Sequence, residues 1–152
     1  MRLSDLFNAE TIMLGVELLD KEALLERVVK YFDSKNMVKD CELALHDVIE
    51  RERVMSTGIG NGVAIPHAYT DGVDQLVAGF FRTDGEVDFA ALDGMGVDLF
   101  FIILGPKASR RSHIKVLAKI SRLLNHEEFR NSLREAQTGE EVLDIFKQFG
   151  DR

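Results

Sequence analysis

The sequence predicts a mixed α/β fold in which a central mixed sheet is covered by helices on both faces. The order of its segments carries this prediction: one short strand, two amphipathic helices, several strands and then three helices. Its 152 residues, of which 45% are hydrophobic and 30% charged, are enough for a globular domain with a sizeable core. No repeat, low-complexity stretch or linker divides the chain, so we expect a single domain over residues 1–152.

The first part of the chain predicts a strand and two helices. Residues 12–16 are a short apolar run that predicts the strand, although Gly15 weakens this prediction. Asp20 is a good N-cap for the helix that follows, with Leu19 able to pack on Leu24. The buried face expected for this helix consists of Leu24, Leu25, Val28, Val29 and Phe32. The second helix is expected to start near Asp40, with a buried stripe of Cys41, Ala44, Leu45, Val48 and Ile49.

Strands are expected in the middle of the chain. Three glycines within residues 56–66 make that segment too flexible for a helix. Residues 75–82 and 97–104 predict two strands, and the second is apolar enough to be central in the sheet. Residues 83–86 have the composition of a turn, so we expect a turn there and a further short strand over 87–89.

Three helices are predicted after Gly105 and Pro106. Their apolar faces are marked by Leu117, Ile120 and Leu124, by Phe129, Leu133 and Ala136, and by Val142, Leu143, Ile145 and Phe146. Thr138 and Glu141 have the spacing of a capping box at the start of the last helix.

Charge and cysteine content exclude several classes of protein. The chain has 19 basic and 26 acidic residues, a net charge of −7 that is spread along the chain, so we expect no nucleic-acid partner. The longest apolar run, Leu99–Leu104, is too short to cross a membrane, and the amino terminus lacks the features of a secretory signal. Cys41 is the one cysteine and is interpreted as a packed helical residue. These features predict a cytoplasmic protein with no direct membrane insertion.

Two of the four histidines have settings that indicate chemistry. His46 and His126 lie in helical, acidic surroundings and are interpreted as surface residues. His67 follows Ile65 and Pro66, and proline fixes its own φ and keeps the preceding residue extended. A neutral imidazole so presented can act as a nucleophile if an acceptor holds the proton on its other nitrogen. Local features alone allow equally a histidine satisfied within a tight turn.

Further residues near His67 could bind an oxyanion. Arg51, at the end of the second helix, offers a planar fork of donors that suits phosphoryl oxygens, and Arg53 and Arg82 compete for this role. The hydroxyl groups of Ser56 and Thr57 could donate to an oxyanion or could only shape the turn.

The chain does not match the sequence motifs of common cofactor and metal sites. The Gly58–Val63 segment lacks the third glycine of a dinucleotide site and follows a helix, and no lysine followed by serine or threonine completes a nucleotide phosphate loop. No histidine pair or cysteine pair has zinc-ligand spacing. We therefore expect no cofactor and no metal.

The Arg51-Glu52-Arg53 segment followed by Ser56–Ala68, with the sequence STGIGNGVAIPHA, resembles a known signature. It is similar to that of the type 2 enzyme IIA domain of the bacterial phosphoenolpyruvate-dependent phosphotransferase system, the fructose, mannitol and nitrogen-regulatory group. The Ser112–Leu117 segment, which contains His113, also falls in the expected order, and the resemblance covers nearly the whole chain. It implies a three-layer α/β/α sandwich with a central mixed sheet, the phosphotransferase/anion-transport-protein-like fold.

The resemblance also implies a phosphotransferase chemistry and a set of residues. His67 is the expected phosphoryl acceptor, through Nε2, from the phosphohistidine carrier protein HPr. His113 is expected to contact the phosphoryl oxygens and to stabilise the transferred charge. Arg51 matches the arginine that helps to hold the phosphoryl group or the docking surface, and Thr57 matches a loop hydroxyl residue. Neither a metal nor a nucleotide is implied.

Two functions remain open within this family. In the first, a nitrogen-regulatory protein, the phosphorylation state of His67 controls regulatory target proteins. Members of that branch are likewise single domains, and residues 133–141 resemble their tail, so this function is favoured. In the alternative, a stand-alone fructose- or mannitol-type enzyme IIA passes phosphate to a cysteine of an enzyme IIB domain for sugar uptake. The complete set of His67, His113 and Arg51 disfavours a module that only binds anions.

Overall fold

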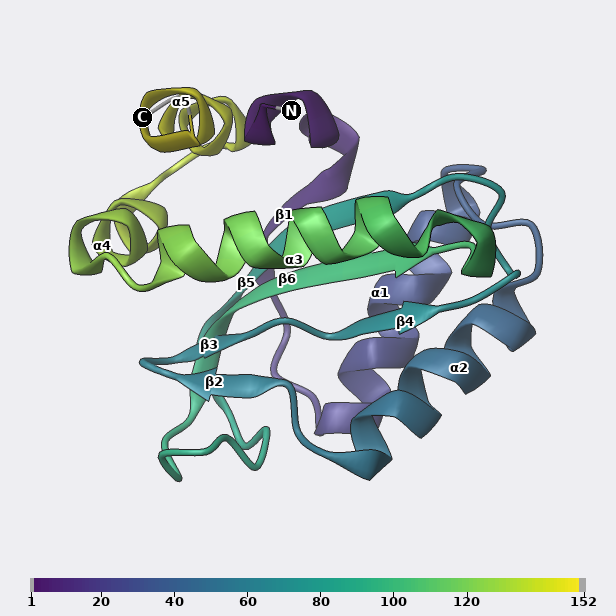
Figure 1. Ribbon diagram of the computed structural model, residues 1–152. Helices are drawn as coiled ribbons and strands as arrows, with labels where there is room; N and C mark the ends of the chain where they lie inside the picture. Colours follow the sequence, from purple (N-terminus) through teal and green to yellow (C-terminus); the bar gives the residue numbers. More distant parts are fainter. Residues whose placement is uncertain (1, 151–152) are drawn as a thin grey trace.

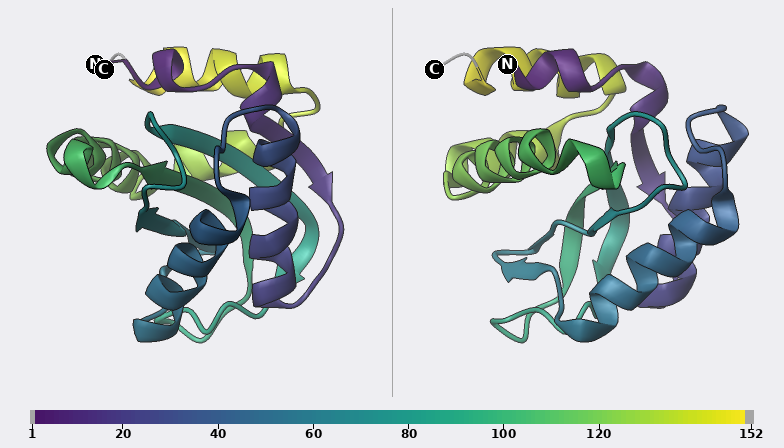
Figure 2. Two further views of the ribbon diagram at one scale, coloured as in Figure 1. Left: turned by 90° about the vertical axis from the view of Figure 1, so that its right-hand side faces the viewer. Right: turned by 45° about the vertical axis from the view of Figure 1, so that its right-hand side comes forward.

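A central mixed sheet separates two helical layers in the computed structural model, which describes residues 2–150 (Figures 1 and 2). The predicted three-layer α/β/α sandwich is thus confirmed, while residue 1 and residues 151–152 of the expected domain lie outside the described part. The strands are β1 (Ile12–Val16), β2 (Gly58–Gly60), β3 (Val63–Ala64), β4 (His67–Tyr69), β5 (Val77–Val87) and β6 (Val97–Gly105). The α-helices are α1 (Lys21–Ser34), α2 (Cys41–Val54), α3 (Arg110–Leu124), α4 (Glu127–Glu135) and α5 (Gly139–Gly150), with short 3₁₀ helices η1 (Leu3–Leu6), η2 (Ala9–Thr11) and η3 (Lys107–Ser109).

The sheet has the strand order β1-β5-β6-β3-β2, and β4 also pairs with β6. β5 and β6 are antiparallel, whereas β1 runs parallel to β5. β3 and β4 both run parallel to β6 and occupy successive lengths of the same edge. Only Ile65 and Pro66 separate these two short strands. The histidine that follows Pro66 therefore starts a new strand at a break in the edge of the sheet.

The central strand β6 is buried on both faces, as its continuous apolar run predicts. Leu99, Phe101 and Ile103 pack in a core with α3, α4, α5 and η1. The alternate residues Phe100, Ile102 and Leu104 pack in a second core with α1 and α2. Two cores on opposite faces of one strand hold both helical layers against the sheet.

The two helices that precede the glycine-rich segment start where the sequence predicts. The side chains of Asp20 and Asp40 accept hydrogen bonds from the backbone N–H groups of Ala23 and Leu43. All five residues of the buried face expected for α1 are buried. On α2, Ala44 and Val48 are buried but Cys41, Leu45 and Ile49 are only half-buried, while the charged Glu52 is buried. The interpretation of Cys41 as fully packed is therefore corrected to a half-buried position.

The turn predicted over residues 83–86 is wrong, because β5 continues through this segment to Val87. The pairing register with β6 shifts between Arg82, which pairs with Leu99, and Val87, which pairs with Val97. The extra residues form a bulge, and the Thr83 hydroxyl donates a hydrogen bond within it to the carbonyl of Gly85. A bulge and a turn need the same polar and glycine residues, so composition could not separate them. The short strand expected over 87–89 is accordingly only the end of β5.

The capping box predicted for α5 forms in part. The Thr138 hydroxyl accepts a hydrogen bond from the backbone N–H of Glu141 at 3.2 Å, as expected. The Glu141 carboxylate accepts from the N–H of Gln137 at 2.8 Å instead of that of Thr138. The backbone N–H that the glutamate binds therefore lies one residue earlier in the chain than in a regular capping box.

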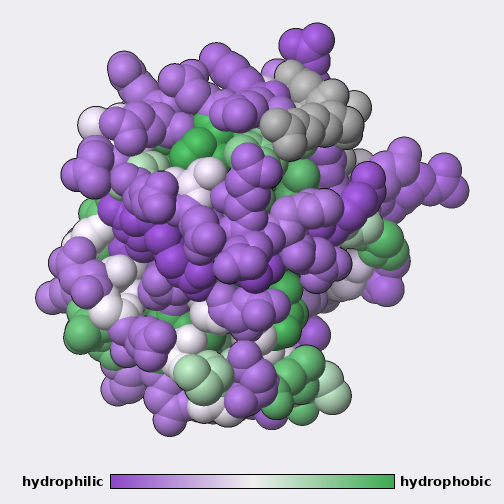
Figure 3. Space-filling view, turned by 90° about the vertical axis from the view of Figure 1, so that its left-hand side faces the viewer, coloured by the Kyte–Doolittle hydropathy of each residue, from purple (hydrophilic) through white to green (hydrophobic). Residues whose placement is uncertain are grey.

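Charge is less evenly distributed than the sequence analysis expects. Residues 99–126, which include all of α3, contain six Lys and Arg residues and no Asp or Glu. Hydrophilic side chains cover most of the face of the molecule that carries α4 (Figure 3). Among the described residues, no helix has both the length and the apolarity that a membrane crossing requires.

Candidate functional site

Two elements line a pocket of about 240 Å³, and a third, α3, carries a ring next to it. The last turns of α2 contribute Asp47 and Arg51, and β4 contributes His67, Ala68 and Tyr69. The first turn of α3 carries His113, whose ring lies 5.8 Å from that of His67. The structure therefore brings together three of the four predicted site residues, His67, His113 and Arg51.

His67 is fixed by the chain just before it. Pro66 has no N–H to leave unpaired at this edge, and its carbonyl accepts a hydrogen bond from the N–H of Ile103 at 3.0 Å. The Nδ1 atom of His67 lies 2.7 Å from the carbonyl oxygen of Ile65. A carbonyl oxygen can only accept, so Nδ1 carries the proton and the neutral ring keeps its lone pair on Nε2. The local backbone thus sets both the direction and the tautomer of the ring.

The surroundings of His67 favour its neutral form. Burial lowers the pKa of His67 most, and the positive charge of Arg51 lowers it further. The hydrogen bond to Ile65 and the charge of Glu52 oppose this shift without reversing it. At neutral pH the half-buried ring therefore presents an unprotonated nitrogen, the form that a nucleophile requires.

His113 lies on α3 with its ring fully buried, and neither of its ring nitrogens has a hydrogen-bond partner among the described residues. Burial, together with the neighbouring His67, lowers the pKa of His113 to about 4. An unpaired buried polar group costs about 1–3 kcal/mol, so its retention in a protein needs a reason. A ligand oxygen that arrives beside His67 would supply the missing partner.

Arg51 is the arginine that lines the pocket, and its two competitors are engaged elsewhere. One Nη of Arg51 donates to the carbonyl of Met55 at 3.0 Å, which leaves its other N–H groups for a ligand. Arg53 is exposed and pairs with Glu22 and Glu50. Arg82 donates to the carbonyls of Leu133, Arg134 and Ala136 at the end of α4.

Thr57 lies apart from the pocket and is buried. Its hydroxyl donates to the Glu52 carboxylate at 2.6 Å, and its N–H donates to the other carboxylate oxygen at 2.8 Å. Lys21 completes the group with an ion pair to Glu52 at 2.7 Å. These contacts join α1, the end of α2 and the segment before β2, so Thr57 supports the helix turn that carries Arg51.

Two side chains of the pocket wall, Asp47 and Tyr69, are not among the predicted site residues. Asp47 precedes Arg51 by four residues, which places both on one face of α2. Tyr69 follows His67 by two residues in β4, so both side chains lie on the same face of the strand. The two spacings were visible in the sequence, but only with the correct helix and strand boundaries could they indicate a shared site.

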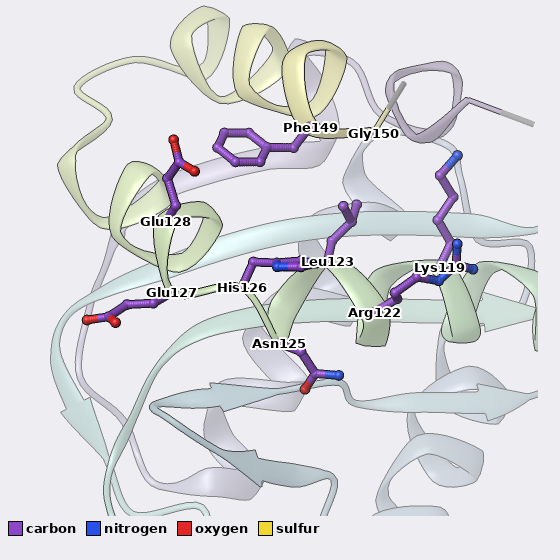
Figure 4. Close-up of a pocket in the computed structure, with 9 residues that line it drawn as sticks. All are labelled: Lys119, Arg122, Leu123, Asn125, His126, Glu127, Glu128, Phe149 and Gly150. Carbon is purple, nitrogen blue, oxygen red and sulfur yellow. The ribbon is translucent and has the colours of Figure 1, made fainter. Parts of the chain in front are cut away.

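The other two histidines lie outside this site, on the surface as predicted. His46 is exposed on α2, and His126 is exposed just before α4. His126 lines a separate pocket of about 540 Å³ between α3, α4 and the end of α5 (Figure 4). Helix geometry puts the end of α3 at Leu124, two residues before His126, about 16 Å from His113.

The arrangement suits transfer of an anionic group to a nitrogen nucleophile. It offers a neutral imidazole with a fixed tautomer, an adjacent guanidinium and a second imidazole with unused hydrogen-bonding capacity. Within residues 2–150, no group of three or more His, Cys, Asp or Glu side chains could hold a metal ion. What the described residues offer to a transferred group is position and positive charge.

The chain is similar to known proteins over nearly its whole length. Residues 5–149 match the model of a protein family described as "Phosphoenolpyruvate-dependent sugar phosphotransferase system, EIIA 2". The chain is 34% identical over 148 residues to the "PTS system fructose-specific EIIABC component" of Bacillus subtilis. This match covers 97% of this chain but only 23% of that relative. It is 32% identical over 145 residues to the "Nitrogen regulatory protein" of Pseudomonas aeruginosa, covering 95% of this chain and 94% of the relative.

A solved structure, nitrogen regulatory protein IIA-Ntr from Neisseria meningitidis, superimposes with a TM-score of 0.83 at 31% identity. The superposition covers 95% of this chain and 98% of that structure.

Proposed function

Because the chain belongs to the type 2 enzyme IIA family of the phosphotransferase system, whose members are phosphotransferase phosphocarriers, we propose that it carries the phosphoryl group on Nε2 of His67. The proposed donor is an HPr-type phosphohistidine carrier in the cytoplasm. One observation supports this assignment above the others. The hydrogen bond from Nδ1 of His67 to the carbonyl of Ile65 leaves Nε2 as the nitrogen with a free lone pair.

The proposed step exchanges one phosphorus–nitrogen bond for another. The lone pair on Nε2 of His67 attacks the phosphorus atom, and the bond between phosphorus and the donor histidine nitrogen breaks. That electron pair returns to the donor ring, which leaves as a neutral imidazole when its other nitrogen carries a proton, so no proton has to pass between the two rings and no other reactant is consumed. The barrier is then lowered by alignment and by stabilisation of the charge on the three phosphoryl oxygens.

Arg51 and His113 are proposed to stabilise those oxygens. Arg51 lines the same pocket as His67 and keeps N–H groups that Met55 does not engage. His113 is neutral near pH 7, and its ring N–H has no acceptor among the described residues until a phosphoryl oxygen arrives. Thr57 is proposed to act indirectly, by supporting through Glu52 the turn of α2 that carries Arg51.

For the downstream step, we favour a regulatory role in which phosphorylation of His67 changes the binding of target proteins. Support comes from the Pseudomonas aeruginosa and Neisseria meningitidis nitrogen-regulatory proteins, which this chain matches over nearly their full lengths. The alternative is transfer to a cysteine of an enzyme IIB domain, as enzyme IIA domains of this family perform. The similarity to the fructose-specific component of Bacillus subtilis supports that alternative.

The acceptor residue is tested by incubating the protein with enzyme I, HPr and labelled phosphoenolpyruvate from the same organism. We expect the wild-type protein and His46→Ala, a surface control, to be labelled, and His67→Ala to remain unlabelled. Label on His67→Ala at the wild-type level would refute the assignment.

The downstream role is tested with the labelled protein after HPr has been removed. Rapid transfer of the label to an isolated fructose-type or mannitol-type enzyme IIB domain, and not to its cysteine-to-serine variant, would support the transport alternative. Retention of the label in the presence of these domains is the result that a regulatory role predicts.

A further inference from the structure

Four side chains from β4 and α3 alternate in one continuous row of contacts between tilted rings, which we call the stack. The rings of His67 and His113 are 5.8 Å apart, and those of His113 and Tyr69 are 4.4 Å apart. The guanidinium carbon of Arg110 lies 4.5 Å from the centre of the Tyr69 ring. His67 and Tyr69 share one face of β4, while Arg110 and His113 lie one turn apart on α3. The stack runs from the nucleophile to an exposed arginine.

The inner end of this stack has no polar contact that would hold the His113 ring. Both nitrogens of His113 lack partners among the described residues, so hydrogen bonds do not define its orientation. The ring is placed by packing: a Cβ atom at Gly105 would lie 2.9 Å from Nδ1, and Tyr69 packs against the ring. Of these two neighbours of the His113 ring, Gly105 has no side chain, so Tyr69 is the one whose side chain can change the position of the ring.

The outer end of the stack holds Tyr69 in place. A guanidinium over an aromatic ring is attracted to the negative face of the ring, at about 0.5–1 kcal/mol for an exposed pair. Arg110 is exposed, and the structure shows no ion pair for it among the described residues. Its contact with Tyr69 therefore restrains the ring without competition from an acidic neighbour.

We propose that Tyr69, restrained by Arg110, is a positioning residue that keeps the His113 ring dry and oriented for the phosphoryl group on His67. This inference rests on the proposed function, which makes His113 a phosphoryl contact. Tyr69 lines the pocket and is half-buried there, while the His113 ring that packs against it is fully buried. The aromatic ring carries this role, and its hydroxyl is not required.

The first measurement follows the titration of the His113 ring by NMR in the unphosphorylated protein, and needs no phosphate donor. In the wild-type protein we expect a midpoint near the pKa of about 4. Tyr69→Ala admits water to the ring and should raise the midpoint by at least about one unit toward the ordinary value. Tyr69→Phe should keep it low.

The second measurement is the rate of phosphoryl transfer from phosphorylated HPr. Tyr69→Ala should slow transfer roughly tenfold, because a misplaced contact to the phosphoryl group is costly. Tyr69→Phe should retain at least half of the wild-type rate. Arg110→Ala, a surface change that leaves the fold intact, should slow transfer about threefold, whereas its exposed neighbour Arg111→Ala should not.

Each outcome decides the proposal. A wild-type midpoint and rate in Tyr69→Ala would overturn it, as would equal loss in Tyr69→Phe and Tyr69→Ala, which would assign the role to the hydroxyl. If Tyr69→Ala does not fold, equal rates for Arg110→Ala and Arg111→Ala would overturn it. If the wild-type protein is not phosphorylated at all, the proposed function fails, while the titration still shows whether Tyr69 places the His113 ring.

Discussion

The two histidines of the site lie side by side but differ in what the protein gives them. His67 has a carbonyl acceptor for one nitrogen and a pocket beside the ring. His113 has full burial and no hydrogen-bond partner among the described residues. The first arrangement makes His67 a nucleophile. The second leaves the ring N–H of His113 without an acceptor until a negatively charged phosphoryl group binds. The burial of the His113 ring should therefore affect how the free energy of unfolding depends on pH.

Acid should destabilise the protein through His113. Its pKa is about 4 in the folded state and near 6.5 in the unfolded chain, so between these values only the unfolded state binds the proton. Stability from this group is therefore fully present above about pH 6.5 and decreases as the pH falls. At pH 5 the loss should be about 2 kcal/mol relative to pH 7.

The measurement is urea unfolding of the wild-type protein and of His113→Phe at pH 7, 6 and 5. The variant is the control because its side chain cannot bind a proton. The difference in unfolding free energy between the two proteins should change with pH by the stated amount. Parallel pH dependences would show that the folded protein does not resist protonation of His113.

Among the elements, α2 depends most on distant parts of the chain. Its last turn carries Arg51 to the pocket and also buries Glu52, whose carboxylate is paired with Lys21 of α1 and hydrogen-bonded to Thr57. A buried carboxylate is tolerated only when such partners are in place. The turn that carries Arg51 is thus held by contacts of the next residue of the same helix.

Thr57→Val should lower the unfolding free energy by about 2 kcal/mol, because a hydrogen bond to a buried charge is lost while the shape of the side chain is kept. Phosphorylation by HPr at a temperature where the variant is folded should slow only about threefold, since Thr57 supports the turn that carries Arg51 but does not itself line the pocket. Wild-type stability combined with strongly reduced transfer would instead assign the hydroxyl a direct contact with the phosphoryl group.

At the scale of the whole molecule, one sheet lies between two cores in the described residues. Neighbouring residues of β6, Ile102 and Ile103, are both fully buried but face opposite cores. Loss of packing in either core should therefore destabilise β6, the strand that both cores share. We therefore propose that residues 1–152 form one domain that unfolds cooperatively.

Ile102→Ala and Ile103→Ala should each lower the unfolding free energy by about 3 kcal/mol, the usual cost of emptying a buried isoleucine site. Calorimetry should show one transition for each variant, with equal calorimetric and van't Hoff enthalpies. Two transitions, of which only one moves in each variant, would divide the chain into independent units.

The sequence could predict what depends on neighbours in the chain. His67 was identifiable because Ile65 and Pro66 immediately precede it, and the layers followed from the order of apolar segments. The partner of Thr57 was not predictable, because the burial of Glu52 depends on Lys21 from another helix. The contact of Tyr69 with His113 likewise depends on how α3 packs against β4. Tertiary packing, which no local pattern contains, decided both.

The central claim is that one nitrogen of one side chain carries the phosphoryl group, and NMR of the phosphorylated protein with ¹⁵N-labelled histidine tests it most directly. The account predicts that phosphorus–nitrogen coupling develops on Nε2 of His67 alone, while Nδ1 keeps its proton and its bond to the carbonyl of Ile65. Coupling on Nδ1 of His67 or on a ring nitrogen of His113 would contradict it. So would the absence of phosphorus from all four histidines in the presence of active carriers from the same organism.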